Sequence, residues 1–273
     1  MRVSLILTVL NEAAHIPRLF DSIIAQQRQP DEVVVCDGGS TDDTVAIVNT
    51  YAGRLPIRVV AAPGANISTG RNTAIRAATG GLIVVTDAGV WLEPDWLAQL
   101  VAALESAPDG RPALAAGFYH ADTETPFEVA LGATVLPEWR DIDPRRFLPS
   151  SRSVAFRKSA WEAVGGYPEW LDYSEDVVFD LEMRARFGDF ALVPEAGAHF
   201  RPRQNLIAFV RQYFNYAGGD GRAGLFPRIH FIRYFTYLVA APLGLYAALT
   251  VSPLLWAVGV LAGVVYIRTP LRR

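Results

Sequence analysis

Short apolar segments alternate with helix-like segments in the N-terminal part of this chain. The apolar segments are Val3–Val9, Glu32–Cys36, Ile57–Ala61 and Leu82–Thr86. The helix-like segments that follow them are Ala13–Gln27, Thr44–Tyr51, Ser68–Thr79 and Pro94–Leu104. Strands that are buried on both faces read as continuous apolar runs, and parallel strands need a crossover between them. The alternation therefore predicts an α/β fold in which helices flank a mostly parallel, Rossmann-type sheet.

A sheet of this kind binds ligands in the crevice outside the carboxyl ends of its strands. Polar or small residues stand at those ends in this sequence, namely Thr8, Asn11, Glu12, Asp37, Gly39 and Asp87. Carboxylates there can hold a divalent cation, and glycine lets the backbone approach a ligand closely. Arg71, near the start of a helix-like segment, offers a planar fork that suits a diphosphate. Together these residues indicate a site for a nucleotide diphosphate.

Several other classes of protein are excluded by motifs that the sequence lacks. No G-x-G-x-x-G follows the first apolar segment, which excludes a dinucleotide-binding dehydrogenase. The phosphate-binding G-x-x-x-x-G-K-[ST] is absent, and the single lysine, Lys158, lies elsewhere. The G-x-S-x-G of serine hydrolases is also missing. The single cysteine, Cys36, excludes a disulfide framework and a cysteine-based zinc site.

The second half of the globular part is less regular. Residues 120–150 are rich in proline and charge, which predicts an insertion or a mobile loop. Ser153–Arg157 reads as a strand and Lys158–Val164 as a short helix. Ser174 is expected to cap a helix that runs to about Phe187.

A glycine-rich stretch follows the amphipathic segment Asn205–Ala217. Gly218–Gly224 contains four glycines and Arg222, which predicts a flexible loop before the C-terminal region. Glycine-rich segments suit a gating role, so this loop is expected to close over the donor diphosphate with Arg222 in contact.

Charge is distributed unevenly along the chain. Residues 1–200 carry 27 acidic and 16 basic side chains, whereas residues 201–273 carry one acidic and nine basic side chains. No charged residue occurs from Tyr234 to Ile267. As one helix, this stretch would be ~51 Å long, which exceeds the ~30 Å hydrocarbon core of a membrane. A break is expected at Thr250–Pro253, because proline disfavours helix in the residue before it.

The expected break leaves two apolar segments, Tyr234–Val251 and Pro253–Ile267. Arginines flank them on both sides, at positions Arg228, Arg233, Arg268, Arg272 and Arg273. By the positive-inside rule both ends then lie in the cytoplasm, so the segments are expected to form a hairpin in the plasma membrane or cell inner membrane. The alternative is a helical hairpin buried inside a soluble protein. Val3–Leu10 lacks a convincing cleavage site for a signal peptide, so the globular part is expected to remain cytoplasmic.

Five motifs resemble those of family 2 glycosyltransferases in order and spacing. They are TVLNE (8–12), CDGGSTD (36–42), GRN (70–72), TDAG (86–89) and SED (174–176). The resemblance covers about residues 1–225 and implies an inverting enzyme with the GT-A fold. It implies a nucleotide-binding half over about 1–110, an acceptor half over about 111–225 and a membrane-associated helical hairpin over 226–273.

The resemblance also implies a role for individual residues. Thr8 and Glu12 match positions that line the nucleoside pocket, and Asp37 matches the aspartate that reads the base. Arg71 matches an arginine near the nucleotide and diphosphate. Asp87 matches the first aspartate of the D-x-D motif, which meets the ribose and the metal-bound diphosphate.

The E-D motif supplies the catalytic residues that the resemblance implies. Asp176 matches the general base, and its neighbour Glu175 is expected to position the acceptor or the base. A helix N-terminus favours an ionised carboxylate, which suits a base at this position.

One position departs from the family pattern. Gly89 stands where the D-x-D motif usually has its second aspartate, so a divalent metal, Mg²⁺ or Mn²⁺, would lack one side-chain ligand. Possible substitutes are Glu93 and His199, or the phosphates of the donor. His199 stands where some enzymes of this fold carry a metal-ligating histidine.

The sequence therefore predicts transfer of a sugar from a nucleotide-diphosphate sugar to a hydroxyl acceptor, without a nucleic-acid partner. A site beside a membrane favours a lipid-linked or cell-envelope glycan as acceptor. A metal-dependent phosphohydrolase or nucleotidyltransferase could use the same carboxylates, and a non-catalytic nucleotide-sugar-binding scaffold could retain them. Titration with nucleotide sugars, with and without Mn²⁺, separates these three functions.

Overall fold

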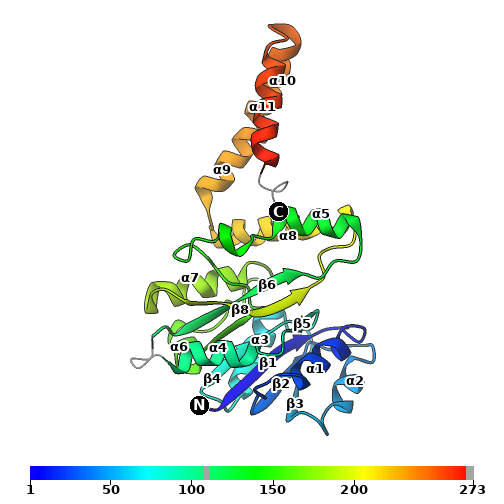
Figure 1. The fold of residues 1–273 in the computed structure, drawn as a ribbon, viewed down its shortest axis with the longest axis vertical. Helices are drawn as coiled ribbons and strands as arrows, with labels where there is room; N and C mark the ends of the chain where they lie inside the picture. Colours follow the sequence, from blue (N-terminus) through cyan, green and yellow to red (C-terminus); the bar gives the residue numbers. More distant parts are fainter. Residues whose placement is uncertain (107–110, 269–273) are drawn as a thin grey trace.

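The computed structural model describes residues 1–106 and 111–268. An eight-stranded sheet with the order β3-β2-β1-β4-β7-β6-β8-β5 forms the centre of the globular part (Figure 1). The first four strands are parallel and have the bounds Val3–Val9 (β1), Glu32–Asp37 (β2), Ile57–Ala61 (β3) and Leu82–Val85 (β4). The predicted α/β class and parallel N-terminal strands are thus confirmed.

The second half of the sheet changes direction. Its strands are Val90–Leu92 (β5), Leu114–Ala121 (β6), Val154–Arg157 (β7) and Ala191–Phe200 (β8). β7 runs antiparallel to β4, with Val154 opposite Val85. The residues that precede β7 therefore lie at the edge where β4 ends.

Helices cover both faces of the sheet. They are Ile16–Ile24 (α1), Thr44–Thr50 (α2), Ile67–Ala77 (α3), Trp96–Glu105 (α4), Lys158–Val164 (α6) and Glu175–Phe187 (α7). Side chains of β1 alternate between two buried clusters: Leu5 and Leu7 pack with α1, α2 and α4, whereas Ile6 packs with α3, α6 and α7. This alternation explains why the strand is apolar at nearly every position.

The prediction of an irregular segment over residues 120–150 is wrong in part. Helix α5 spans Pro126–Val135 and is followed by a single 3₁₀ turn, Trp139–Asp141. Thr125 and Glu128 form a capping box, in which each side chain accepts a hydrogen bond from the other residue's backbone N–H. This pattern, with proline in the first turn, is a helix start that was present in the sequence.

The prediction of a flexible loop at Gly218–Gly224 is also wrong. Helix α8 spans Leu206–Ala223 and continues through the glycines. A Cβ atom at Gly219 would lie 2.4 Å from the carbonyl oxygen of Tyr173. Glycine is therefore required at position 219 by close packing of α8 on the loop before α7.

The C-terminal helices extend away from the globular part (Figure 1). Helix α9 (Pro227–Phe235), a π-helical segment (Thr236–Ala240) and α10 (Ala241–Thr250) follow one another without a break, and α11 (Leu255–Ile267) folds back along α10. The predicted hairpin and its break before Pro253 are confirmed.

The first arm of the hairpin is long enough for a membrane. Among the described residues, Pro227–Thr250 is the one helix whose length and apolar composition would allow it to cross a bilayer, and it is almost entirely exposed. Helix α11, with 13 residues, is shorter. Arg272 and Arg273, used above in the positive-inside argument, lie outside the described residues.

Candidate active site

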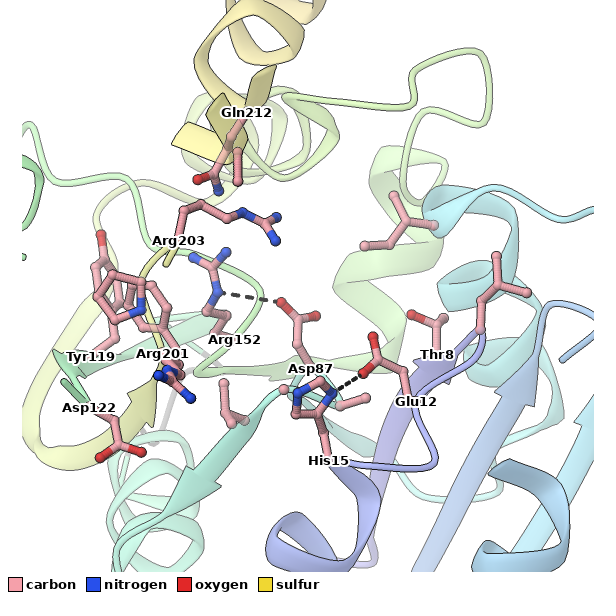
Figure 2. A pocket seen from close by; sticks show the side chains of 18 of the residues that line it. Thr8, Glu12, His15, Asp87, Tyr119, Asp122, Arg152, Arg201, Arg203 and Gln212 are labelled. Atoms are coloured by element: carbon pink, nitrogen blue, oxygen red, sulfur yellow. Dashed lines mark hydrogen bonds and ion pairs between the residues drawn. The ribbon is translucent and has the colours of Figure 1, made fainter. Parts of the chain in front are cut away.

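A cavity of about 1060 Å³ opens at the carboxyl edge of the parallel strands (Figure 2). One part is lined by the end of β1 and the following loop, with Thr8 and Glu12, and by Gly38 after β2. The opposite part is lined by β6 and α8 and includes Tyr119, Gln212, Tyr213 and Tyr216. Asp87, after β4, also lines the cavity. The predicted binding edge of the sheet therefore coincides with this cavity.

A buried arginine connects Asp87 to the start of α7. Arg71 Nη2 donates to Asp87 Oδ1 at 2.9 Å, and Arg71 Nη1 donates to Glu175 Oε1 at 2.7 Å. The Arg71 side chain is 3% exposed, and its Cζ lies 5.3 Å from the ring centroid of Tyr167. Burial opposes the charge of Arg71, but Asp87 and Glu175 outweigh it and raise the pKa of the guanidinium. Arg71 therefore serves as the charged link between two predicted site residues.

Glu175 and Asp176 occupy the first turn of α7, as predicted. Burial, opposed by Arg71 and reinforced by the negative charge of Asp176, raises the pKa of Glu175 to about 7. Asp176 is half-buried, and its Oδ1 accepts from the N–H of Val177 at 2.9 Å. One turn later, burial, with Asp176 adding to it, raises the pKa of Asp180 well above its ordinary value. Asp176 thus stands between two carboxyl groups that burial disfavours as anions.

Ser174 precedes α7 but does not cap it. Its backbone is left-handed, and its hydroxyl donates to Asp220 Oδ1 at 2.8 Å instead of accepting from the helix. Asp220 Oδ2 lies 3.2 Å from Nε2 of His230 on α9. The loop that precedes the E-D motif is thus held by α8, which also contacts the base of the C-terminal hairpin.

The residues predicted for the nucleoside end take different positions. Thr8 and Glu12 line the cavity, and Glu12 Oε2 lies 2.7 Å from His15 Nδ1. Asn11 Oδ1 accepts from the N–H of Thr41 at 2.9 Å, which joins the loops after β1 and β2.

Asp37 and Gly39 shape the turn after β2. The Asp37 carboxylate is buried and accepts from the N–H groups of Gly39 and Ser40 at 3.1–3.2 Å. Gly39 has a φ of +100°, a conformation that favours glycine. Neither residue lines the cavity, whereas Gly38 between them does.

Arg152 is a cavity residue that the sequence reasoning missed. Its Nε lies 3.6 Å from Asp87 Oδ2, and its Cζ lies 4.6 Å from the ring centroid of Phe200 (Figure 2). Arg152 reaches this edge because β7 runs antiparallel to β4. The reversal has no signal in the apolar pattern, and Arg152 fell between the segment predicted to be irregular (120–150) and the predicted strand Ser153–Arg157.

The residues present do not fit a divalent metal site. Both carboxylate oxygens of Asp87 face guanidinium groups, and Gly89 adds no ligand. His199 Nε2 lies 2.9 Å from Glu93 Oε1, and the His199 ring stacks on Trp91 with centroids 3.8 Å apart. Neither His199 nor Glu93 lines the cavity. Within residues 1–106 and 111–268, no group of three or more metal-ligating side chains is suited to hold an ion.

Arg222 lies away from the cavity. It is on the last turn of α8, its side chain is 68% exposed, and Nη1 lies 3.7 Å from Asp172 Oδ2. The loop through which it was expected to reach the donor is helix. No described contact brings Arg222 to the other predicted site residues.

Comparison with known proteins finds a family match over the N-terminal part of the chain. The sequence profile of glycosyl transferase family 2 matches residues 4–129. The chondroitin synthase of Pasteurella multocida (strain Pm70) is 35% identical over 94 residues, which are 34% of this chain and 10% of that protein. The chain therefore spans only a small fraction of that relative.

Two further proteins match over most of the chain. The O-antigen chain rhamnosyltransferase WbaN of Salmonella anatum is 24% identical over 233 residues, 74% of this chain and 71% of that protein. The mannosyltransferase PcManGT of Pyrobaculum calidifontis, solved with GDP-Man and Mn²⁺, has a TM-score of 0.72 at 22% identity and covers 99% of this chain and 82% of that one. The chain thus matches the glycosyl transferase family 2 model over residues 4–129 and shares its overall fold with a solved mannosyltransferase.

Proposed function

We propose that this chain is an inverting glycosyltransferase that moves a sugar from a nucleotide-diphosphate sugar to a hydroxyl group of a lipid-linked or cell-envelope glycan. The Asp87–Arg71–Glu175 ion-pair chain is the observation that carries the proposal. It joins the strand-end carboxylate at the cavity to the helix turn that bears Asp176. A donor held at Asp87 would then have a carboxylate base within the same part of the site.

The cavity suits a nucleotide sugar by size and by lining. Its volume of about 1060 Å³ is slightly above that of ordinary ligand pockets, which span ~300–1,000 Å³. We assign the nucleoside to the end lined by Thr8 and Glu12, beside the turn formed by Asp37 and Gly39. The diphosphate would lie near Asp87, and the sugar would point toward the start of α7.

The proposed reaction is a single displacement at the anomeric carbon. The acceptor hydroxyl oxygen forms the new bond to this carbon while the bond to the diphosphate oxygen breaks, and the leaving diphosphate keeps that electron pair. The hydroxyl proton passes to the carboxylate of Asp176. Attack from the side opposite the leaving group inverts the carbon. Glu175, held by Arg71, would orient the helix turn that carries Asp176.

The proposed acceptor follows from the surroundings of α8. One face of α8 lines the cavity with Gln212 and Tyr216, while Ile207, Val210 and Phe214 on another face are largely exposed. Exposed apolar side chains beside an apolar hairpin are typical of a protein that lies on a membrane. An acceptor with a lipid tail would then approach from the membrane side of the cavity.

We infer a corresponding division of the chain. Residues 1–225 would form the catalytic domain, with its donor half over about 1–110, and residues 226–273 would anchor it. Arg228 and Arg233 lie near the start of the first arm and Arg268 directly follows the second, which favours a cytoplasmic position for both ends of the hairpin at a plasma membrane or cell inner membrane. Flotation of the full chain with phospholipid vesicles would test the anchor, and recovery only in the soluble fraction would contradict it.

The catalytic proposal is tested by incubating the full chain with nucleotide sugars and membrane glycolipids. We expect release of nucleoside diphosphate and a glycosylated lipid whose new linkage is inverted relative to the donor. Release of nucleoside monophosphate would instead indicate a phosphohydrolase or nucleotidyltransferase. Donor binding without turnover in the presence of acceptor would favour a scaffold.

A further inference from the structure

We propose that Arg152 and Arg203 form a cationic subsite for the donor diphosphate and take the place of a divalent metal in this chain. This inference rests on the proposed function, because it concerns the leaving group of the same reaction. In Figure 2 both guanidinium groups point into the open space above Asp87. Both residues line the cavity.

The charges around the cavity single out these two arginines. Arg18 forms an ion pair with Asp122, and Arg201 pairs with Glu124 and Glu128 at 2.7 Å and 2.6 Å. Arg203, in contrast, forms no ion pair with any residue in the part of the chain that the structure describes. Its charge is therefore available to a bound anion.

The positive charge of Arg152 is also available to a bound anion. Its partner Asp87 is shared with Arg71, whose hydrogen bond to that carboxylate is shorter. The Arg152 side chain is 26% exposed, and Nη1 donates to Ser150 Oγ at 3.3 Å while the guanidinium stacks on Phe200. These contacts hold the group in one orientation and leave part of its edge facing the cavity.

The chemistry of the ligand matches this pair. A diphosphate is a multiply charged anion, and a guanidinium can donate two parallel hydrogen bonds to it. Developing charge on the leaving diphosphate would be stabilised by fixed cations that need no rearrangement. Two guanidinium groups supply the two positive charges that a divalent ion otherwise brings.

Substitution of Gly89 independently tests whether the two arginines replace a metal. A Cβ atom there would meet no atom within 4 Å, so an aspartate side chain has room. Gly89→Asp restores the second carboxylate of the D-x-D pattern beside Asp87. We expect this variant to acquire a response to Mn²⁺ that the natural chain lacks.

Titration calorimetry on the full chain tests the inference. Nucleoside diphosphates carrying each common base are titrated into the chain. The one that binds is then compared with its parent nucleoside, and each titration is carried out once in excess EDTA and once in Mn²⁺. We expect EDTA to leave the diphosphate affinity of the natural chain unchanged. Arg152→Ala should weaken diphosphate binding about 10- to 100-fold and leave nucleoside binding unchanged, because charged hydrogen bonds are lost only to the phosphates. Arg203→Ala should act in the same direction.

Arg18→Ala is the matched control, since it removes a cavity arginine that is already neutralised, and it should leave diphosphate affinity unchanged. Arg152→Lys, which keeps the charge, should restore part of the affinity and show that the site is folded. Loss of diphosphate binding in EDTA with recovery in Mn²⁺, or an unchanged affinity in Arg152→Ala, would overturn the inference and leave the proposed function intact. Failure of every nucleoside diphosphate to bind would instead overturn the proposed function and this inference with it.

Discussion

The guanidinium of Arg71 donates a 2.7 Å hydrogen bond to Glu175, a residue 104 positions later in the chain. The same guanidinium donates to Asp87. One side chain thus links the end of strand β4 to the first turn of helix α7. The separation between the proposed donor site and the proposed base therefore depends on Arg71.

Arg71→Met should destabilise the fold strongly. The change leaves the buried Glu175 without its cation, while Asp87 keeps Arg152, and breaking a buried pair costs about 3–5 kcal/mol. Chemical denaturation of the purified chain measures the loss. Arg76→Ala is the control on the same helix, because Arg76 is 58% exposed and pairs with Glu169 at the surface. It should cost at most about 1 kcal/mol. Equal losses in the two variants would contradict the assigned role of Arg71.

Asp176→Asn should abolish sugar transfer while donor binding is retained. An amide has nearly the same shape as the carboxylate but cannot take the acceptor proton, so turnover should fall about 100- to 10,000-fold. Nucleoside diphosphate release and donor titration measure the two effects separately.

Asp180→Asn is the matched control for Asp176, one turn along α7. Burial raises the pKa of Asp180 well above its ordinary value and so favours its uncharged form, which an amide resembles in shape and charge. Transfer should remain near the level of the natural chain. Substantial transfer by Asp176→Asn would assign the base to another residue.

Glu32 should make stability depend on acid pH. Burial opposes its ionisation, but hydrogen bonds from Ser4, Thr79 and Gly80 outweigh burial and lower the pKa of Glu32 from 4.5 to about 2. Since the pKa is lower in the folded chain than in the unfolded chain, the stabilisation is complete above pH 4.5 and is lost as the pH falls toward 2. The lowered pKa of Glu32 contributes on the order of 3 kcal/mol to the free energy of unfolding above pH 4.5.

Glu32→Gln should remove this acid dependence, as measured by denaturation at a series of pH values. The variant should be less stable than the natural chain at neutral pH and approach it near pH 2. Glu105→Gln is the control: hydrogen bonds from Arg28 and the N-terminus also lower the pKa of Glu105 to about 2, but at the surface such pairs contribute less than about 1 kcal/mol, so this variant should lose much less stability. If stability still falls in the same way at acid pH in Glu32→Gln, the acid dependence does not arise from Glu32.

Local pattern was sufficient to predict β1 to β4, their flanking helices and the C-terminal hairpin. Each of these elements buries or exposes apolar residues in a way that is visible within a few positions of the chain. The partners of Arg71 were beyond such reasoning, because an arginine suited to phosphate is equally suited to two carboxylates far away in sequence. Arg152 was missed for a related reason, since the antiparallel course of β7 is decided by pairing with β4.

The glycines of α8 illustrate the remaining difficulty. Their composition favoured a loop, because glycine has low helix propensity. Packing decided otherwise: Gly219 lies against the backbone of Tyr173 and the hydroxyl of Ser174, so the helix needs a residue without a side chain there. The contact partner is distant in sequence and unknown until the fold is present.

Gly219→Ala should therefore disturb the start of α7 and reduce transfer. Its new Cβ atom would lie 2.4 Å from the carbonyl oxygen of Tyr173 and 2.9 Å from Ser174 Oγ, so α8 must move away from the loop that precedes the E-D motif. The neighbouring Gly218→Ala is the control, because a Cβ atom there meets nothing within 4 Å. Gly218→Ala should raise stability by up to about 1 kcal/mol through helix propensity and leave transfer unchanged. Thermal unfolding and transfer assays on both variants distinguish the positions. If Gly219→Ala were as active and as stable as Gly218→Ala, the packing of α8 against Tyr173 would not be what positions Asp176.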